Sequence, residues 1–510
     1  MQNSETELNS PRAVVTRCHL IYPGRAVSVL SSPLWFDGAT VDRCVRNSNI
    51  TSTLLMAVYM DANSTTPLAP EVIESIMQTA EKAWYNPSSS YDKIGKVVIK
   101  NARKSIAGLF DVQCDDIVFT SGGTESNFMV FHTIASLPWG FLPHVITTNV
   151  EHPSVLRPLA KMANEGRLDL TIVPVDRITG VVNPSTILGA LRPNQTVLVS
   201  LMLANNETGA IMPVEDVVRA VRDWEAQLYK STDNLVPSSY RVFIHSDLAQ
   251  AVGKLDVNIR KLGIDYGTIV GHKFYGPRIG ALYIRGLHTY TPETWLDRTP
   301  YRNVPTNCGH EDCYNVPPAP LIPLFLGGGQ ESGFRSGTEN TPMIAGLAKA
   351  AELVSANLAS YMSHMSCMRE QLIQQLCMAF PPVPGHPNII IFGVHRGLSS
   401  NLNGLIHRDP QRLTVLPNTV NLAFSGPPYL DSREILALCP NLCASRGAAC
   451  HSDQTGSSVL LACGYSVEES KSAIRLSIGR DTVFENIYST VAALREAVSQ
   501  LSGPTVRPSK

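Results

Sequence analysis

The sequence lacks an excess of charge of either sign. Its 510 residues include 42 Lys and Arg against 43 Asp and Glu, which gives a formal net charge of −1. Proteins that bind nucleic acid or anionic membranes through their overall field carry a clear positive excess. The balance therefore argues against both kinds of partner. The sequence also lacks internal repeats, and it has no apolar run approaching the ~20 residues of a membrane-spanning helix.

The cysteines lack the spacing of a metal site. There are 11 of them, scattered and odd in number. Neither Cys308 with Cys313 nor Cys439 with Cys443 fits the two-pair spacing of zinc sites. Since no signal peptide is recognisable, we expect free thiols in a reducing compartment and no bound metal. The cytosol is the expected location, with mitochondrial import as the alternative.

Apolar segments alternate with helical patterns from Val58 onward. Residues 1–57 are rich in Ser, Asn and Arg without a sustained period, so we predict a disordered N-terminal extension. Beyond it, segments such as 117–120, 145–148 and 196–202 are apolar throughout and are followed by helical patterns. Continuous apolar strands are typical of a parallel sheet covered on both faces. The pattern predicts an α/β protein with a mostly parallel central sheet.

The second half of the chain changes character. Residues 287–323 are rich in proline and show no period, which predicts a long loop inserted into the large domain. A helical pattern runs from about residue 342 to residue 376, and apolar strand patterns follow at 389–392 and 419–424. We therefore predict a large domain over 58–341 and a smaller α+β C-terminal domain over 342–503.

Lys273 stands at the end of a predicted buried strand. The apolar pair Ile269 and Val270 is broken by Gly271, and Gly276 with Pro277 then turns the chain. The carboxyl ends of parallel strands are where α/β sheets bind ligands. Partial burial there can lower the pKa of a lysine and make it a nucleophile. A solvated lysine just beyond a strand is the alternative.

Ser121-Gly-Gly-Thr-Glu-Ser126 follows a predicted strand and opens a helix. Its glycines allow close approach of a ligand to the backbone, and the helix N-terminus offers free N–H groups to an anion. These features favour a phosphate site. A capped helix start, with Glu125 in the first turn, accounts for the segment equally well.

Three further strand ends carry polar side chains. Asp247 is suited to hold a pyridinium proton, although a helix N-cap is the simpler interpretation. His152 could stack on a flat cofactor or be structural, and Leu203-Ala-Asn-Asn-Glu-Thr-Gly209 could be a turn. Strand ends of one sheet converge in one crevice. Together they supply the amine, acid, ring and phosphate site that pyridoxal phosphate requires.

These segments resemble the pyridoxal-phosphate cysteine desulfurase family, which has the class V aminotransferase fold. The resemblance runs from about Val58 to Leu501. It includes Gly271-His-Lys-Phe-Tyr-Gly-Pro277, Arg335-Ser-Gly-Thr-Glu-Asn340 and Arg475-Leu-Ser-Ile-Gly-Arg480. It implies fold type I, the fold of many pyridoxal-phosphate transferases, in a homodimer. Within the family, the match is best to the branch that acts on selenocysteine.

The resemblance also implies residue roles. Lys273 attaches the cofactor, Asp247 holds its ring nitrogen, and His152 stacks on the ring and moves protons. Arg475 binds the substrate carboxylate, and Asn206 also contacts the substrate. The remaining cofactor contacts implied are Gly123, Thr124 and His272 at the phosphate, Asn206 and Gln250 at the ring hydroxyl, and Thr338 at the phosphate of the partner subunit.

Cys450 is implied as the nucleophile, in the small-residue segment Ala444-Ser-Arg-Gly-Ala-Ala-Cys450. Its thiolate would accept selenium from L-selenocysteine, leaving L-alanine, and pass it to a reductant or acceptor protein. Two residues depart from the family pattern: Val270 replaces a serine, and Pro153 stands where the selenium branch has an acidic residue. A sulfur-specific desulfurase and a scaffold without turnover are the alternatives.

Overall fold

The structure is a computed structural model that describes residues 57–231, 241–289, 318–382, 388–392, 415–426, 429–446 and 456–502. It also describes an antiparallel strand pair near the N-terminus, β1 (His19–Tyr22) with β2 (Arg25–Ser28). Residues 1–57 form one unit and Val58–Lys510 another. Apart from this strand pair, the prediction of a disordered extension falls outside the described residues. The domain boundaries at 341 and 342 also stay a prediction.

A seven-stranded sheet lies at the centre of the larger unit, in the order β4-β10-β9-β8-β7-β5-β6. The pairings among β5 to β9 are parallel, whereas β10 runs antiparallel to both of its neighbours. The prediction of a mostly parallel sheet is confirmed. The strands are β4 (Ile117–Thr120), β5 (His144–Thr148), β6 (Asp169–Val173), β7 (Thr196–Ser200), β8 (Phe243–Asp247), β9 (Tyr266–Val270) and β10 (Gly280–Ile284).

Helices cover both faces of this sheet. On one face, α5 (Gly123–Ser136) and α6 (Pro153–Asn164) share a buried apolar cluster with the strands. The other face packs against α3 (Pro70–Lys82), α4 (Ile94–Phe110), α7 (Pro184–Ala190), α8 (Val214–Ser231) and α9 (Ile259–Leu262). Successive strand residues enter alternate clusters: Ile117 and Phe119 face one side, and Val118 faces the other. This alternation follows from the two-residue repeat of a strand and explains why the strands are apolar throughout.

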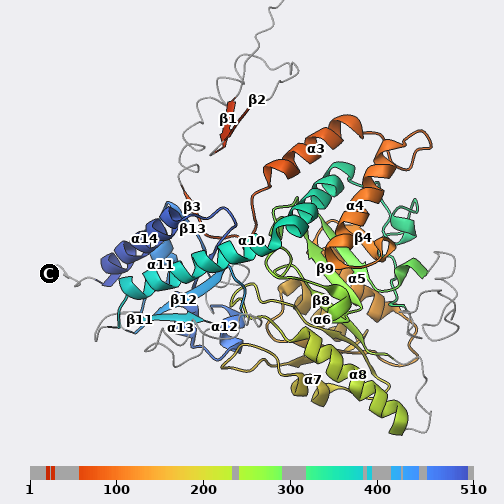
Figure 1. Ribbon diagram of the computed structural model, residues 1–510. Helices are drawn as coiled ribbons and strands as arrows, with labels where there is room; N and C mark the ends of the chain where they lie inside the picture. The colour runs from red at the N-terminus through yellow and green to blue at the C-terminus, as the bar shows by residue number, and fades with distance from the viewer. Residues whose placement is uncertain are drawn as a thin grey trace, which may run out of the picture. The chain divides into compact units, whose positions relative to one another are not determined.

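The long helix α10 (Thr341–Ala379) joins the central sheet to the C-terminal part of the unit (Figure 1). Ile344 and Leu347 pack with α3 and α4, whereas Met368 and Leu372 belong to a second core cluster. That cluster lies between α14 (Phe484–Ser502) and an antiparallel four-stranded sheet, whose order is β11 (Asn388–Phe392), β12 (Thr419–Ser425), β15 (Ile474–Ser477) and β14 (Ser445–Arg446). The predicted small α+β architecture is confirmed.

Short helices complete the C-terminal part: α11 (Ser432–Ala437), α12 (Ser458–Ala462) and α13 (Val467–Ser472). Helix α13 was not predicted from the sequence. It is only six residues long, but a capping box fixes its start: the Ser466 hydroxyl accepts from the Glu469 N–H, and the Glu469 carboxylate accepts from the Ser466 N–H. A serine followed three residues later by a glutamate is the sequence pattern of a capping box, so the start of α13 was predictable from the sequence.

The segment after Val58 packs with the C-terminal part of the chain. Strand β3 (Val58–Tyr59) pairs in parallel with β13 (Leu442–Cys443), and Asp61 forms a bridge with Ser477. This segment therefore lies between the small sheet and the carboxyl end of β9.

The proline-rich insertion is described only at its ends. Residues 290–317 lie outside the described residues. At the far end, Ala319 and Leu321 are fully buried, and the Tyr266 hydroxyl donates to the Pro320 carbonyl at 2.5 Å. The predicted boundary at 323 therefore includes residues that belong to the core. Within the described part of the chain, no helix is both long and apolar enough to cross a membrane.

Candidate active site

Lys273 ends a single helical turn, Gly271–Lys273, that follows β9 directly. Its Nζ lies 2.8 Å from the backbone oxygen of Asn63 and 2.8 Å from that of Ser64. A Cβ on Gly271 would lie 2.5 Å from the Pro277 oxygen, so the tight turn requires glycine there. The amine is thus directed across the carboxyl end of the sheet toward the segment after β3.

Asp247 ends the neighbouring strand β8, as predicted. One carboxylate oxygen accepts from the Ala249 N–H at 3.0 Å, and the other accepts from Nδ2 of Asn127 on α5 at 3.0 Å. Asn127 Oδ1 is buried and has no hydrogen-bond partner within the described part of the chain. These two accepted hydrogen bonds fix the orientation of the Asp247 carboxyl group.

His152 is the N-cap of α6, so Pro153 occupies the first helical position, where its missing N–H costs nothing. Burial lowers the pKa of His152; Asp247 opposes this shift and Lys273 reinforces it. The ring is therefore neutral near pH 7 and close to both charged groups.

The segment after β4 turns directly into α5, whose first helical residues are Gly123 and Thr124. A Cβ on Gly123 would lie 2.6 Å from Val270 Cγ2, so the helix start packs closely against the end of β9. Nearby, His272 Nδ1 lies 3.0 Å from Thr65 Oγ1. Burial and the charge of Lys273 lower the pKa of His272 to about 4.

Gln250 and Asn206 approach the lysine through Asn63. The Gln250 amide donates to the Asn63 oxygen at 3.0 Å, and Asn63 Nδ2 donates to the Asn206 oxygen at 3.3 Å. Behind Gln250, the buried Lys254 donates to Gln250 Oε1 at 3.0 Å. Burial and then the charge of Lys273 lower the pKa of Lys254 to about 7.

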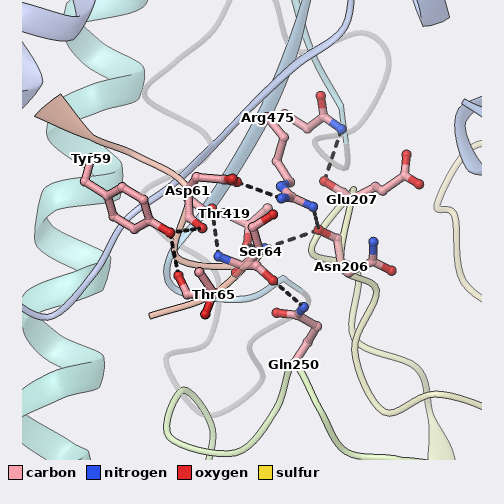
Figure 2. Close-up of polar contacts among 12 residues, drawn as sticks. Tyr59, Asp61, Ser64, Thr65, Asn206, Glu207, Gln250, Thr419 and Arg475 are labelled. Carbon is pink, nitrogen blue, oxygen red and sulfur yellow. Dashed lines mark hydrogen bonds and ion pairs between the residues drawn. The ribbon is translucent and has the colours of Figure 1, made fainter. Parts of the chain in front are cut away.

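Arg475 reaches this network from β15 (Figure 2). Its Nη1 donates to the Asn206 oxygen at 2.9 Å, and its Nη2 donates to Asp61 Oδ1 at 2.8 Å. Lys273 and Arg475, which are far apart in sequence and in different elements, therefore meet around Asn63 and Asn206. The predicted cofactor residues Lys273, Gln250 and Asn206 therefore share one site with the residue predicted to bind the substrate carboxylate.

Two buried carboxyl groups lie beside the site. Burial raises the pKa of Glu151 to about 8, although its carboxylate accepts from the Met202 N–H. Burial likewise raises the pKa of Glu207 to about 7, and Glu207 accepts from the hydroxyl of Ser457. Both groups can change protonation state near neutral pH.

Thr338 lies apart from Lys273, in a hollow of about 190 Å³ that it lines together with Ser121 and Arg335. Arg335 Nε is 2.8 Å from Glu125, which fixes this hollow beside the start of α5. Cys450 lies outside the described residues. Among the residues described, no group of three or more His, Cys, Asp or Glu is placed to hold a metal ion.

Several residues of this network were not predicted from the sequence. Asp61, Asn63 and Ser64 lie in a segment interpreted only as an extended entry to the domain, although its run of polar residues straight after β3 was a usable signal. Asn127 stands one position beyond the phosphate motif. The site role of Lys254 was not predictable, because the sequence does not indicate whether a single lysine is buried.

Comparison with known proteins agrees with this geometry. The family model described as "Aminotransferase class-V" matches residues 58–381. The selenocysteine lyase of Bos taurus is 42% identical over 467 residues, covering 88% of this chain and 94% of that protein. The selenocysteine lyase of Homo sapiens is 40% identical, with 87% and 92% covered.

More distant relatives carry other names. "Cysteine desulfurase IscS" of Methanosarcina thermophila is 32% identical, covering 88% of this chain and 94% of that protein. Among solved structures, a "NIFS-LIKE PROTEIN" superposes with a TM-score of 0.67 at 27% identity, covering 87% of this chain and all of that one.

Proposed function

Since the chain belongs to the class-V aminotransferase family, we propose that it is a pyridoxal-phosphate enzyme that removes selenium from L-selenocysteine and releases L-alanine. The observation that carries the proposal is the meeting of Lys273 and Arg475 around Asn63 and Asn206. An amine able to attach the cofactor and a guanidinium able to bind an amino-acid carboxylate are thereby placed in one site.

The donor set fits pyridoxal phosphate. Its contacts would be the Lys273 amine, the Asp247 carboxylate at the ring nitrogen, the His152 ring, and the N-terminus of α5 with Gly123, Thr124 and His272 at the phosphate. Gln250 and Asn206 would face the ring hydroxyl. When bound, the cofactor makes the α-carbon of an attached amino acid acidic and stores the electrons released there. Lys273 and His152 would move protons to and from the substrate.

Cys450 would take the selenium. Its thiolate forms a sulfur–selenium bond as the bond between selenium and Cβ breaks, and the electron pair left on Cβ takes up a proton to complete L-alanine. A reductant that supplies two electrons, or an acceptor thiol, then removes selenium from Cys450. Arg446, at the end of β14 and near Cys450 in sequence, would favour the thiolate.

A homodimer is part of the proposal. Large apolar side chains are exposed between α3 and α4, including Trp84 and Tyr91, and again at Phe325 and Leu326. Gln330 Nε2 donates to Ser88 Oγ at 3.3 Å, which ties the loop after Leu326 to the segment after Trp84. The exposed apolar side chains within residues 84–97 and 325–326 are together called the aromatic surface. Large apolar side chains exposed in such numbers are a feature of protein interfaces. Thr338 would then reach the cofactor phosphate of the partner.

The second candidate is a sulfur-specific cysteine desulfurase, supported by the 32% identity to a protein of that name. The greater identity to selenocysteine lyases favours selenium. A cytosolic location is also proposed, because described cysteines such as Cys114, Cys367 and Cys443 are free thiols.

Alanine release from L-selenocysteine and from L-cysteine tests the function. We expect turnover of both, with L-selenocysteine clearly faster. Equal rates would overturn the selenium preference in favour of the desulfurase. Absence of alanine from either substrate, with the cofactor bound, would overturn the proposed activity and leave a scaffold.

A further inference from the structure

Arg475 is held from two sides but keeps donors for a ligand. Its side chain is only 5% exposed. Nη1 and Nη2 each have a partner, Asn206 and Asp61, whereas Nε is buried and has no partner among the residues that the structure describes. Because a guanidinium carries five N–H groups, these two contacts leave three, including the Nε–H. A buried donor without a partner is costly unless a ligand supplies one.

Backbone hydrogen bonds of the residues next to Asp61 fix its position in addition to its contact with Arg475. The Ser477 N–H donates to the Met60 oxygen at 2.7 Å, and the Ala62 N–H donates to the Ser477 oxygen at 3.1 Å. The Tyr59 hydroxyl donates to the backbone oxygen of Thr65 at 2.7 Å and lies 3.1 Å from the backbone oxygen of Asp61 (Figure 2). The backbone around Asp61 is thus hydrogen-bonded to β15, the strand that carries Arg475.

The charges around Arg475 favour an anionic ligand. The positive charges of Lys273 and Arg475 both lie close enough to Lys254 to lower its pKa. The carboxyl groups that face Arg475 are Asp61, by direct contact, and Glu207. Asp61 therefore offsets part of a positive cluster at the point where the guanidinium would meet a substrate carboxylate.

We propose that Asp61 is a positioning residue with two effects on the substrate carboxylate. It holds the guanidinium of Arg475 in one orientation, and its negative charge weakens the attraction of Arg475 for the ligand. The first effect secures a fixed substrate orientation, and the second keeps the amino-acid product from binding too tightly. This inference rests on the proposed function, in which Arg475 binds an amino-acid carboxylate.

Two substitutions separate the effects. Asp61→Asn keeps an acceptor for Nη2 and removes the charge, whereas Asp61→Ala removes both. Affinity of the cofactor-loaded protein for L-alanine, followed through the visible absorption of the cofactor, reports the carboxylate contact without turnover. We expect Asp61→Asn to bind L-alanine about three- to tenfold more tightly than the unaltered protein. We expect Asp61→Ala to bind it at least about tenfold more weakly than Asp61→Asn, because Arg475 is no longer oriented.

Matched controls complete the experiment. Ethylamine lacks the carboxylate, so its affinity should not change in either variant, and Asp481→Asn, at an exposed carboxylate, should bind L-alanine normally. The inference is overturned if Asp61→Asn binds L-alanine no more tightly than the unaltered protein, or if ethylamine shows the same changes. Alanine release by the unaltered protein tests the proposed function separately, so the two failures are distinguishable.

Discussion

The hydroxyl of Ser154 lies 2.7 Å from Nδ1 of His152, and the Ser154 N–H donates to the same nitrogen at 3.1 Å. A backbone N–H only donates, so Nδ1 is an acceptor and the proton of the neutral ring is on Nε2. Asn127 Nδ2 donates to the Ser154 oxygen at 2.9 Å, which turns the Ser154 hydroxyl hydrogen toward the ring. The Nε2–H is therefore the group that His152 can offer to a ligand.

Ser154→Ala should raise the pKa of His152, because it removes a hydrogen bond that favours the neutral ring. A neutral hydrogen bond is worth about 1 kcal/mol, so the expected rise is roughly half a unit to one unit. NMR titration of the histidine rings measures it, with His152→Asn identifying the signal. Ser105→Ala, far from the ring in an exposed helix position, should leave the titration unchanged. If the pKa of His152 is the same in Ser154→Ala as in the unaltered protein, Nδ1 of His152 does not accept a hydrogen bond from the Ser154 hydroxyl.

Lys273→Ala should abolish covalent attachment of the cofactor and lower turnover by at least about a thousandfold, since both the attachment point and a proton carrier are lost. Visible absorption and alanine release measure the two effects. Lys261→Ala, at an exposed lysine, should keep both. Normal absorption in Lys273→Ala would place the attachment elsewhere.

Cys450→Ala should keep the colour of the bound cofactor and lose turnover, because the thiolate acts only on selenium. Cys367, an exposed free thiol, provides the matched control: Cys367→Ala should remain active. Unchanged alanine release in Cys450→Ala would remove this thiol from the reaction.

Glu151 should make stability depend on pH. Its pKa in the folded protein, about 8, lies above its usual value of 4.5, so the folded state keeps a proton that the unfolded chain has lost between these values. The stability that this proton contributes is complete below about pH 4.5 and is lost as pH rises through 8. Glu151→Gln mimics the protonated group and should remove this decline, with a gain on the order of 5 kcal/mol at pH 9.

Thermal unfolding at pH 5, 7 and 9 measures that effect. The Glu151→Gln variant should match the unaltered protein at pH 5 and unfold at a higher temperature at pH 9. Glu468→Gln, on the exposed face of α13, should follow the unaltered protein throughout. If the unfolding temperatures of Glu151→Gln and of the unaltered protein change equally with pH, Glu151 is ionised from pH 5 to pH 9.

Leu326→Lys should weaken the homodimer, because it places a charge in the aromatic surface, where Leu326 is 86% exposed. Sedimentation velocity should show a shift toward monomer, and turnover should fall with it if Thr338 serves the partner. Tyr429→Lys, at a side chain that is 69% exposed outside this surface, is the control. A protein that stays dimeric after Leu326→Lys would move the interface elsewhere.

The central sheet was predictable because its strands are buried on both faces. Segments such as 145–148 and 196–202 are apolar throughout, and a run of that length bounded by polar turns is typical of a strand covered on both sides. The strand-end positions of Lys273 and Asp247 followed from the same pattern. The roles assigned to these residues came from the family resemblance rather than from periodicity.

The rest of the site depends on contacts between distant segments. The partners of the Lys273 amine are backbone oxygens of Asn63 and Ser64, and a backbone oxygen has no sequence signature. The shifted pKa values of Lys254 and Glu151 arise from burial, which a single charged residue in a sequence does not reveal. The short strands β3 and β13, two residues each, are below the length at which a period can be recognised.

The pairing of the segment after Val58 with the C-terminal sheet also sets an order of events during synthesis. The Asn63 N–H bonds to Ser477 Oγ across 414 residues of chain. Translation proceeds at about 5–20 residues per second. The segment around Asn63, which accepts hydrogen bonds from Lys273, is therefore made tens of seconds before Ser477 leaves the ribosome. The central sheet can form in that interval, but the site cannot. We therefore expect a nascent chain that stops before β15 to be unable to bind its substrate, however well the large domain has folded.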